Sequence, residues 1–156
     1  MDIKLGATTR DDAQRCGTIC FEAFRAIANE HGFPPDVPSA EVTIGLLAKM
    51  IPDPRFYAIV AEIDNQVVGS NFMDERSAIA GIGPITIDPT VQNRGIGRAL
   101  MGDCMERATE RCVPGVRLLQ AGYHTRSLSL YTKLGFVTRE PLAVMQGPPL
   151  DLQVSG

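Results

Sequence analysis

One stretch decides the fold: Ile85-Thr-Ile-Asp-Pro-Thr-Val-Gln-Asn-Arg-Gly-Ile-Gly-Arg98. A β-branched apolar run ends at Asp88-Pro89, a short polar loop follows, and Gly95 and Gly97 open a helical pattern. The first backbone N–H groups of a helix have no partner within the helix, and the helix dipole favours negative charge there. Glycine brings no Cβ to keep a phosphate oxygen away from these groups. Two arginines beside the glycines add forked cationic donors. The stretch therefore predicts a pocket for a diphosphate or a similar anion.

The spacing within this loop also resembles a known family. Gln92-Asn-Arg-Gly95-Ile-Gly97 is similar to the Gln/Arg-x-x-Gly-x-Gly/Ala signature of the GNAT family, the GCN5-related N-acetyltransferases. A second segment, Ser127-Leu-Ser-Leu-Tyr131-Thr-Lys-Leu-Gly135-Phe136, resembles the late helix of that family at the usual distance downstream. The resemblance covers residues 55–147, and over the first 54 residues only the order of elements fits.

The resemblance implies acetyl-coenzyme A as the co-substrate, because in the GNAT family this loop cradles the pyrophosphate of acetyl-CoA. It also implies that the strand before the loop pairs its backbone with the pantetheine arm, as if the cofactor were an extra strand. The sheet is expected to open between that strand and the one ending at His124. The resemblance assigns cofactor binding to Ile85, Thr86, Ile87, Gln92, Asn93, Arg94, Gly95, Ile96, Gly97, Arg98, His124 and Tyr131. No metal is expected.

Tyr131 matches the usual general acid of the family, which assists the departing thiolate. A phenol has a pKa of ~10 and a thiol one of ~8.5, so full proton transfer is uphill unless the site shifts one of them. A strong hydrogen bond that stabilises developing charge is the better description at neutral pH. The alternative is that Tyr131 anchors its helix to the core.

The general base is less well defined by the sequence. An alkyl ammonium with a pKa of ~10.4 is only about one part in 2,500 neutral at pH 7, so a base is expected. Many family members place a Glu on the strand before the loop, but residues 78–87 contain no acidic residue and no histidine. The candidates are Glu22, Asp74, Glu75 and His124, or backbone carbonyls acting through water.

His124 falls where the family commonly has an Asn that contacts the pantetheine arm. Three interpretations stay open: a supporting contact to the cofactor, a catalytic base, since imidazole titrates near neutral pH, and a residue that merely caps the following helix. His31, beside Gly32 and a proline-rich loop, is expected to be a helix-end residue.

Length and composition favour one globular domain. The chain has 156 residues, of which 44% are hydrophobic and 21% charged, and its net charge is −3. This balance argues against general nucleic-acid binding. No apolar run reaches the ~20 residues of a membrane span, and the first ten residues lack a signal-peptide segment, so we expect a cytoplasmic protein. The domain is expected over residues 1–147, with a tail over 148–156. Without CxxC pairs, the four cysteines are expected to be small buried hydrophobes.

The periodicity predicts a mixed α/β sheet with helices on its faces, in the order β-α-α-β-β-β-α-β-α-β-β. This is also the element order of the GNAT family. Strands are expected over residues 3–7, 56–63, 67–73, 78–87 and 116–123, helices over 11–30, 39–51, 95–111 and 125–134, and a terminal hairpin over 136–147. Glycines and a proline within 78–87 indicate a bulge or a close backbone approach.

The favoured function is an N-acetyltransferase that moves the acetyl group of acetyl-CoA directly to a primary amine on a small molecule or peptide. The segment Phe24–Ile51 is expected to cover the acceptor side, by resemblance, and the alternative is a loop that is only packed against the fold. An alternative is a non-catalytic acyl-CoA-binding or regulatory module on the same fold. A Rossmann-type dehydrogenase is disfavoured, because Gly95-Ile-Gly97 lacks the third glycine. A homodimer is possible, again by resemblance only.

Overall fold

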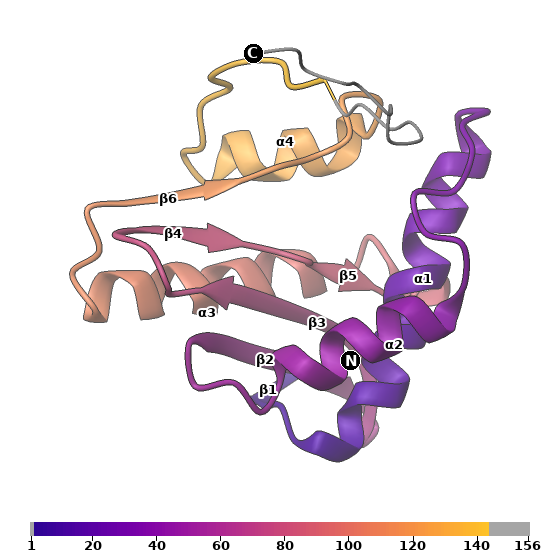
Figure 1. The fold of residues 1–156 in the computed structure, drawn as a ribbon, viewed down its shortest axis with the longest axis horizontal. Helices are drawn as coiled ribbons and strands as arrows, with labels where there is room; N and C mark the ends of the chain where they lie inside the picture. Colours follow the sequence, from indigo (N-terminus) through magenta and orange to yellow (C-terminus); the bar gives the residue numbers. More distant parts are fainter. Residues whose placement is uncertain (1, 144–156) are drawn as a thin grey trace, which may run out of the picture.

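The computed structural model describes residues 2–143. A mixed sheet forms the centre, with strand order β1-β2-β3-β4-β6, and β5 also pairs with β3. Helices α1 and α2 lie on one face of the sheet, while α3 lies behind it and α4 runs along the β6 side (Figure 1). The strands are β1 Lys4–Ala7, β2 Phe56–Ile63, β3 Gln66–Asp74, β4 Ile79–Ile82, β5 Thr86–Ile87 and β6 Gly115–Leu118.

The helices begin and end within two residues of the predicted positions. Prolines and glycines separate them, since neither continues a helix. The α-helices are α1 Ala13–Glu30, α2 Ala40–Met50, α3 Ile96–Glu110 and α4 Thr125–Lys133, and short 3-10 turns span Arg10–Asp12 (η1) and Pro89–Val91 (η2). Within residues 2–143, no helix combines the length and the apolar character that crossing a membrane requires.

The first half of the sheet is a continuous antiparallel meander. β2 and β3 pair along their whole lengths, and a tight turn with positive φ at Asp64 and Asn65 joins them. Side chains alternate across the sheet: Val60 packs against α1 and α2, whereas Ile59 packs under α3. The layer of α1 and α2 and the layer of α3 therefore pack on opposite faces of β2 and β3.

Helices α1 and α2 approach each other unusually closely at Gly17. A Cβ at this position would stand 2.4 Å from the Cα of Ile44. The hydroxyl of Thr43 donates a 2.8 Å hydrogen bond to the Gly17 carbonyl in the same buried contact. The glycine is needed because only a residue without a side chain lets the backbones meet at this separation.

The predicted strand over 78–87 is broken into two pieces, as its glycines and proline suggested. β4 pairs with β3 up to Ile82 opposite Met73, and β5 resumes with Thr86 opposite Ser70. Three residues, 83–85, therefore oppose two residues of β3, which is the count of a β-bulge. The expectation of a bulge is confirmed.

The strand after α3 is shorter than predicted, and the sheet opens beside it. β6 runs parallel to β4 from Gly115 to Leu118, so residues 119–123 leave the sheet although the pattern had favoured a strand to residue 123. The reason is the bulge, because once β5 turns away there is no neighbouring strand for residues 119–123 to pair with. Within the described chain β5 pairs with β3 alone. The predicted opening between these strands is confirmed.

Two other expectations need correction. The terminal hairpin over 136–147 was wrong for its first strand, since residues 136–143 form no strand and Val137 and Leu142 are exposed. Pro141 lacks the N–H that a ladder needs. Residues 144–147 and the tail 148–156 lie outside the described residues. The expectation that all four cysteines are buried was wrong for Cys112, which is exposed. This residue lies just past the end of α3, with a φ of +51°.

The other three cysteines are buried and free, as predicted. Burial raises the pKa of Cys16 to about 11 and the pKa values of Cys20 and Cys104 to about 12. These thiols stay protonated at neutral pH and are poor nucleophiles.

Candidate active site

The segment after β5 is fixed by a buried carboxylate. Asp88 accepts hydrogen bonds from the backbone N–H of Thr90 at 2.9 Å and from its hydroxyl at 2.6 Å. Arg15 of α1 forms a 2.6 Å ion pair with the same carboxylate. Burial alone would raise the pKa of Asp88, but the bonds from Thr90 and Arg15 outweigh it and hold this pKa below its usual range. The strand-to-loop corner is therefore anchored to α1.

The glycine loop itself is held by backbone conformation and one side chain. Asn93 and Gly95 adopt positive φ angles of 65° and 86°. The amide of Gln92 donates a 3.1 Å hydrogen bond to the carbonyl of Ile87. Gln92 was predicted to bind the cofactor, and in the structure its amide holds the loop against β5.

The loop leads into the N-terminus of α3, which has no side-chain cap among the described residues. The first intrahelical bond runs from the N–H of Ala99 to the carbonyl of Gly95. The N–H groups of Ile96, Gly97 and Arg98 are therefore left for an outside acceptor. The Ile96 side chain is buried in the core, so only its backbone can serve a ligand.

Gly97 marks the point where three elements meet. A Cβ built on it would lie 3.4 Å from Cδ1 of Ile87 on β5 and 3.4 Å from Cδ2 of Leu130 on α4. The N-terminus of α3 therefore lies against both β5 and α4. A larger side chain at this position would enter the space between them.

The backbone of β5 has one edge that faces away from β3. The N–H of Asp88 bonds to the carbonyl of Val68, and Thr86 stands opposite Ser70. Because antiparallel ladders alternate, the N–H and C=O of Ile87 point the other way, toward the opening beside β6. Thr86 was predicted to bind the cofactor, but its backbone faces β3 and its side chain is buried.

Tyr131 lies on α4 and is buried in the cluster that also contains Ile82, Ile85 and Leu118. Its ring centroid is 6.1 Å from that of Phe136. Burial raises the pKa of the Tyr131 phenol, so the hydroxyl is protonated at neutral pH. Within residues 2–143 this hydroxyl makes no hydrogen bond that would occupy it, so it is available as a donor. Both the anchoring interpretation and the donor interpretation fit this position.

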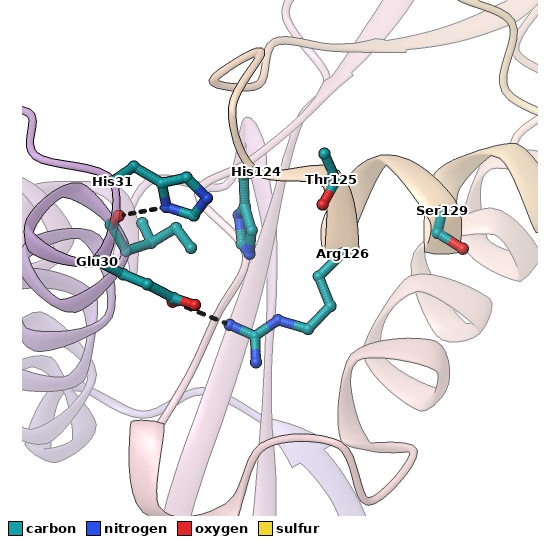
Figure 2. A pocket seen from close by; sticks show the side chains of 7 residues that line it. Glu30, His31, His124, Thr125, Arg126 and Ser129 are labelled. Atoms are coloured by element: carbon teal, nitrogen blue, oxygen red, sulfur yellow. Dashed lines mark hydrogen bonds and ion pairs between the residues drawn. The ribbon is translucent and has the colours of Figure 1, made fainter.

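His124 lies at the start of α4 and lines a cavity of about 440 Å³. The cavity separates the first turns of α4 from the last turn of α1, and Figure 2 shows His124 and His31 on its two sides. His124 is the N-cap residue of α4, as the capping interpretation expects, but among the described residues its side chain makes no cap bond and is left for another role. Burial and then the charge of Arg126 lower the pKa of His124, against a smaller opposing effect of Glu30. The ring is neutral at pH 7.

Two of the four candidate bases are in the wrong part of the fold. Asp74 pairs opposite Gly81, at the far end of β3 from β5, and is bound by Arg76 at 2.6 Å. Glu75 is bound by the arginines at 107 and 111 at 2.9 and 3.2 Å, with its side chain 6% exposed. Both are structural carboxylates, and we drop them as candidates. Glu22 instead lines a groove beside Asp88 and Thr90.

The residues of α1 that face His124 were missed as functional residues. His31 is the C-cap of α1, as expected, but it also lines the cavity with Glu30 and Arg126. No local pattern signals this, because the end of α1 and the start of α4 meet only through the fold. No group of three or more His, Cys, Asp or Glu side chains within residues 2–143 is arranged to hold a metal ion.

Comparison with known proteins agrees with this arrangement. Two solved structures share the fold at low sequence identity. The PaiA N-acetyltransferase from Thermoplasma acidophilum, in complex with coenzyme A, has a TM-score of 0.77 at 15% identity, covering 90% of this chain and 93% of that chain. A predicted acetyltransferase with acetyl-CoA from Clostridium acetobutylicum has a TM-score of 0.71 at 14% identity, covering 93% and 96%.

A sequence relative covers a shorter region. The mycothiol acetyltransferase of Nocardia farcinica is 36% identical over 63 residues, which are 40% of this chain and 21% of that protein. The match therefore spans only about a fifth of the length of that protein. The model of the acetyltransferase (GNAT) family matches residues 18–136, which is more than half of this chain. On this match, the chain belongs to the GNAT acetyltransferase family.

Proposed function

We propose that the protein transfers the acetyl group of acetyl-CoA directly to a primary amine. One observation carries the proposal: the edge of β5 that has no strand partner lies between the N-terminus of α3, which begins at the glycine loop, and the buried phenol of Tyr131. Ile87 at one end of this edge adjoins Gly97, and Ile85 at the other end shares a hydrophobic cluster with Tyr131. Such an edge suits an extended ligand with a phosphate group at one end.

The backbone supplies most of the proposed cofactor contacts. The N–H groups of Ile96, Gly97 and Arg98 would bind the diphosphate, and the guanidinium of Arg98 would add charge-assisted bonds. The outward N–H of Ile87 and the backbone of Ile85 would pair with the amides of the pantetheine arm, while the Ile87 carbonyl accepts from Gln92. Asn93 and Arg94, exposed in the same loop, complete the proposed diphosphate site.

Acetyl-CoA supplies a thioester, whose carbonyl carbon receives the amine. The new C–N bond forms as the C–S bond breaks, and the electron pair of that bond leaves with the sulfur. Tyr131 would donate a hydrogen bond to the departing sulfur, which stabilises the thiolate without requiring full proton transfer. The thiolate is protonated on release, and the amine loses one proton.

His124 is the base that we propose for this proton. Its lowered pKa keeps the imidazole neutral at pH 7, so a lone pair is available to accept a proton. In the same position a neutral ring would also contact the pantetheine arm. The two roles predict different pH dependences of kcat/KM.

The proposal is tested first by calorimetric titration with acetyl-CoA, with NADH as the control. We expect micromolar binding of acetyl-CoA and no binding of NADH. An amine panel read by thiol release then separates an enzyme from a non-catalytic acyl-CoA-binding module, which would bind without turnover. A folded sample that fails to bind acetyl-CoA would contradict the proposed cofactor site. A cytoplasmic location and a homodimer stay predictions.

A further inference from the structure

The cavity between α1 and α4 is a second concave site, beside the proposed cofactor edge. Its volume of about 440 Å³ lies within the range of small-molecule pockets, ~300–1,000 Å³. The described residues that line it come from the end of α1 and the start of α4, and none belongs to β5 or to the glycine loop. The cavity is therefore not part of the proposed diphosphate site. A reaction between two substrates needs a second site of this kind.

The cavity carries one group of each formal charge. Arg126 on α4 and Glu30 on α1 face each other across it, with 3.9 Å between their nearest nitrogen and oxygen atoms (Figure 2). Their side chains are 49% and 63% exposed. A long, exposed pair of this kind contributes little to stability, so a ligand can replace it at small cost. The planar guanidinium of Arg126 is suited to bind a carboxylate through two parallel hydrogen bonds.

The same cavity also presents two imidazole rings. Nδ1 of His31 lies 3.0 Å from the carbonyl oxygen of Ile27. A carbonyl can only accept, so Nδ1 carries a hydrogen, and Nε2 is the ring nitrogen left to face a ligand. His124 on the opposite wall is neutral at pH 7 and offers a lone pair. These ring nitrogens can bind the amino group of an acceptor.

We propose that this cavity binds the acceptor, and that the acceptor is a primary amine that also carries a carboxylate, of the amino-acid class. Arg126 binds the carboxylate, and the amine lies toward His31 and His124. The inference rests on the proposed acetyl transfer and adds the substrate class. The carboxylate of Glu30 disfavours a polyanion in the cavity, which argues against a second phosphate site there.

The test compares each standard amino acid that carries a primary α-amine with its own carboxamide as acceptor, measured by thiol release from acetyl-CoA. The amide keeps the amine and the side chain but removes the negative charge. We expect at least one amino acid to be acetylated with a kcat/KM about 10- to 100-fold above that of its amide, as for loss of a charge-assisted hydrogen bond. In the Arg126→Gln variant this ratio should fall to about 1, while Arg126→Lys retains part of it.

Acetyl-CoA affinity is measured by calorimetry on the same samples, with Arg10→Gln in the distant η1 turn as the matched control. The inference requires that Arg126→Gln bind acetyl-CoA like the wild type and that Arg10→Gln change neither affinity nor ratio. Weaker acetyl-CoA binding by Arg126→Gln with an unchanged ratio would assign Arg126 to the cofactor and overturn the inference. Equal turnover of acid and amide, or acetyl-CoA binding without turnover of any amino acid, would overturn it too. Loss of acetyl-CoA binding by the wild type would instead contradict the proposed function.

Discussion

The two halves of the sheet use their backbone groups differently. In the half formed by β1, β2 and β3, the ladders are long, with one register shift between Ala61 and Glu62, and α1 and α2 pack over them with a close backbone approach at Gly17. In the half formed by β5, β6 and α4, the ladders last two and four residues, and β5 keeps one free edge within the described chain. The first half is stabilised by its own pairing. The second half leaves groups for a ligand, so binding capacity appears where pairing stops.

The largest effect on acetyl-CoA binding is expected from a substitution at Gly97, which would block the proposed diphosphate site in the second half of the sheet. The Gly97→Glu variant would insert bulk and negative charge between Ile87 and Leu130, at the proposed diphosphate site. We expect calorimetry to detect no acetyl-CoA binding. Gly102→Glu is the matched control, because a Cβ at Gly102 on the same helix meets nothing within 4 Å. Normal binding by Gly97→Glu would remove the loop from the cofactor site.

The next effect concerns chemistry in the second half. Tyr131→Phe removes only the hydroxyl and keeps the ring in its cluster. We expect kcat to fall about 100-fold, within the range of general acid–base contributions, and the acetyl-CoA Kd to change less than about twofold. Tyr57→Phe is the control, since it also removes one tyrosine hydroxyl, which bonds to Asp103 on α3 at 2.6 Å. An unchanged kcat in Tyr131→Phe would leave Tyr131 as an anchor only.

The first half should respond in stability rather than in binding. Gly17→Ala would force a methyl group to within 2.4 Å of the Ile44 Cα, and backbone cannot move aside as a flexible side chain can. We expect a loss of about 3 kcal/mol, the upper end of the overpacking range. Thermal unfolding should then show a Tm lower by about 6–12 °C for a chain of this size.

Gly45→Ala on α2 is the same glycine-to-alanine change, but it should raise the stability that Gly17→Ala lowers. A Cβ at Gly45 meets nothing within 4 Å, and the residue is exposed in a helix interior. We expect a gain of about 0.5–1 kcal/mol, because alanine loses less conformational entropy than glycine in a helix. If the two variants changed Tm alike, the close contact of α1 with α2 would not be the cause.

The same contrast explains how far the sequence could be interpreted. The strand 56–63 and the four helices were predicted within one or two residues, because their periodicity and breakers are local. The end of β6 could not be predicted, since residues 119–123 look like a strand and lack only a neighbour. Likewise, the bond from the Gln92 amide to the Ile87 carbonyl could not be predicted, because it depends on how the loop folds back onto β5.

The cavity proposed for the acceptor shows this limit most clearly. Glu30 and Arg126 are ordinary surface residues in the sequence, and only the packing of α1 beside α4 brings them to 3.9 Å. The proposed anion site at Gly95 and Gly97 is different, since the loop and the helix start that would form it are consecutive in the chain. A site proposed on one segment can therefore be predicted from the sequence, whereas a site built from two distant segments cannot.

The last prediction separates the two roles of His124 by pH. The groups facing it are Arg126 on its own helix and Glu30 and His31 on α1. A pKa below the ordinary 6.5 means that the base form predominates above pH 6.5 and is lost as the pH falls through the lowered value. We measure kcat/KM of the wild type and of His124→Gln from pH 5 to pH 8 with one acceptor. The ratio of the two cancels the ionisation of the amine itself.

If His124 is the base, this ratio should be about 10 and flat above pH 6.5, and should fall toward 1 at lower pH as wild-type His124 becomes protonated. If His124 only contacts the pantetheine arm, His124→Asn should restore the rate, because an amide can replace a neutral ring as a hydrogen-bonding group. The ratio for His124→Gln would then track acetyl-CoA affinity at every pH. A ratio independent of pH with unchanged acetyl-CoA affinity contradicts both roles, and His31 would then be the remaining imidazole in the cavity to test by the same measurement.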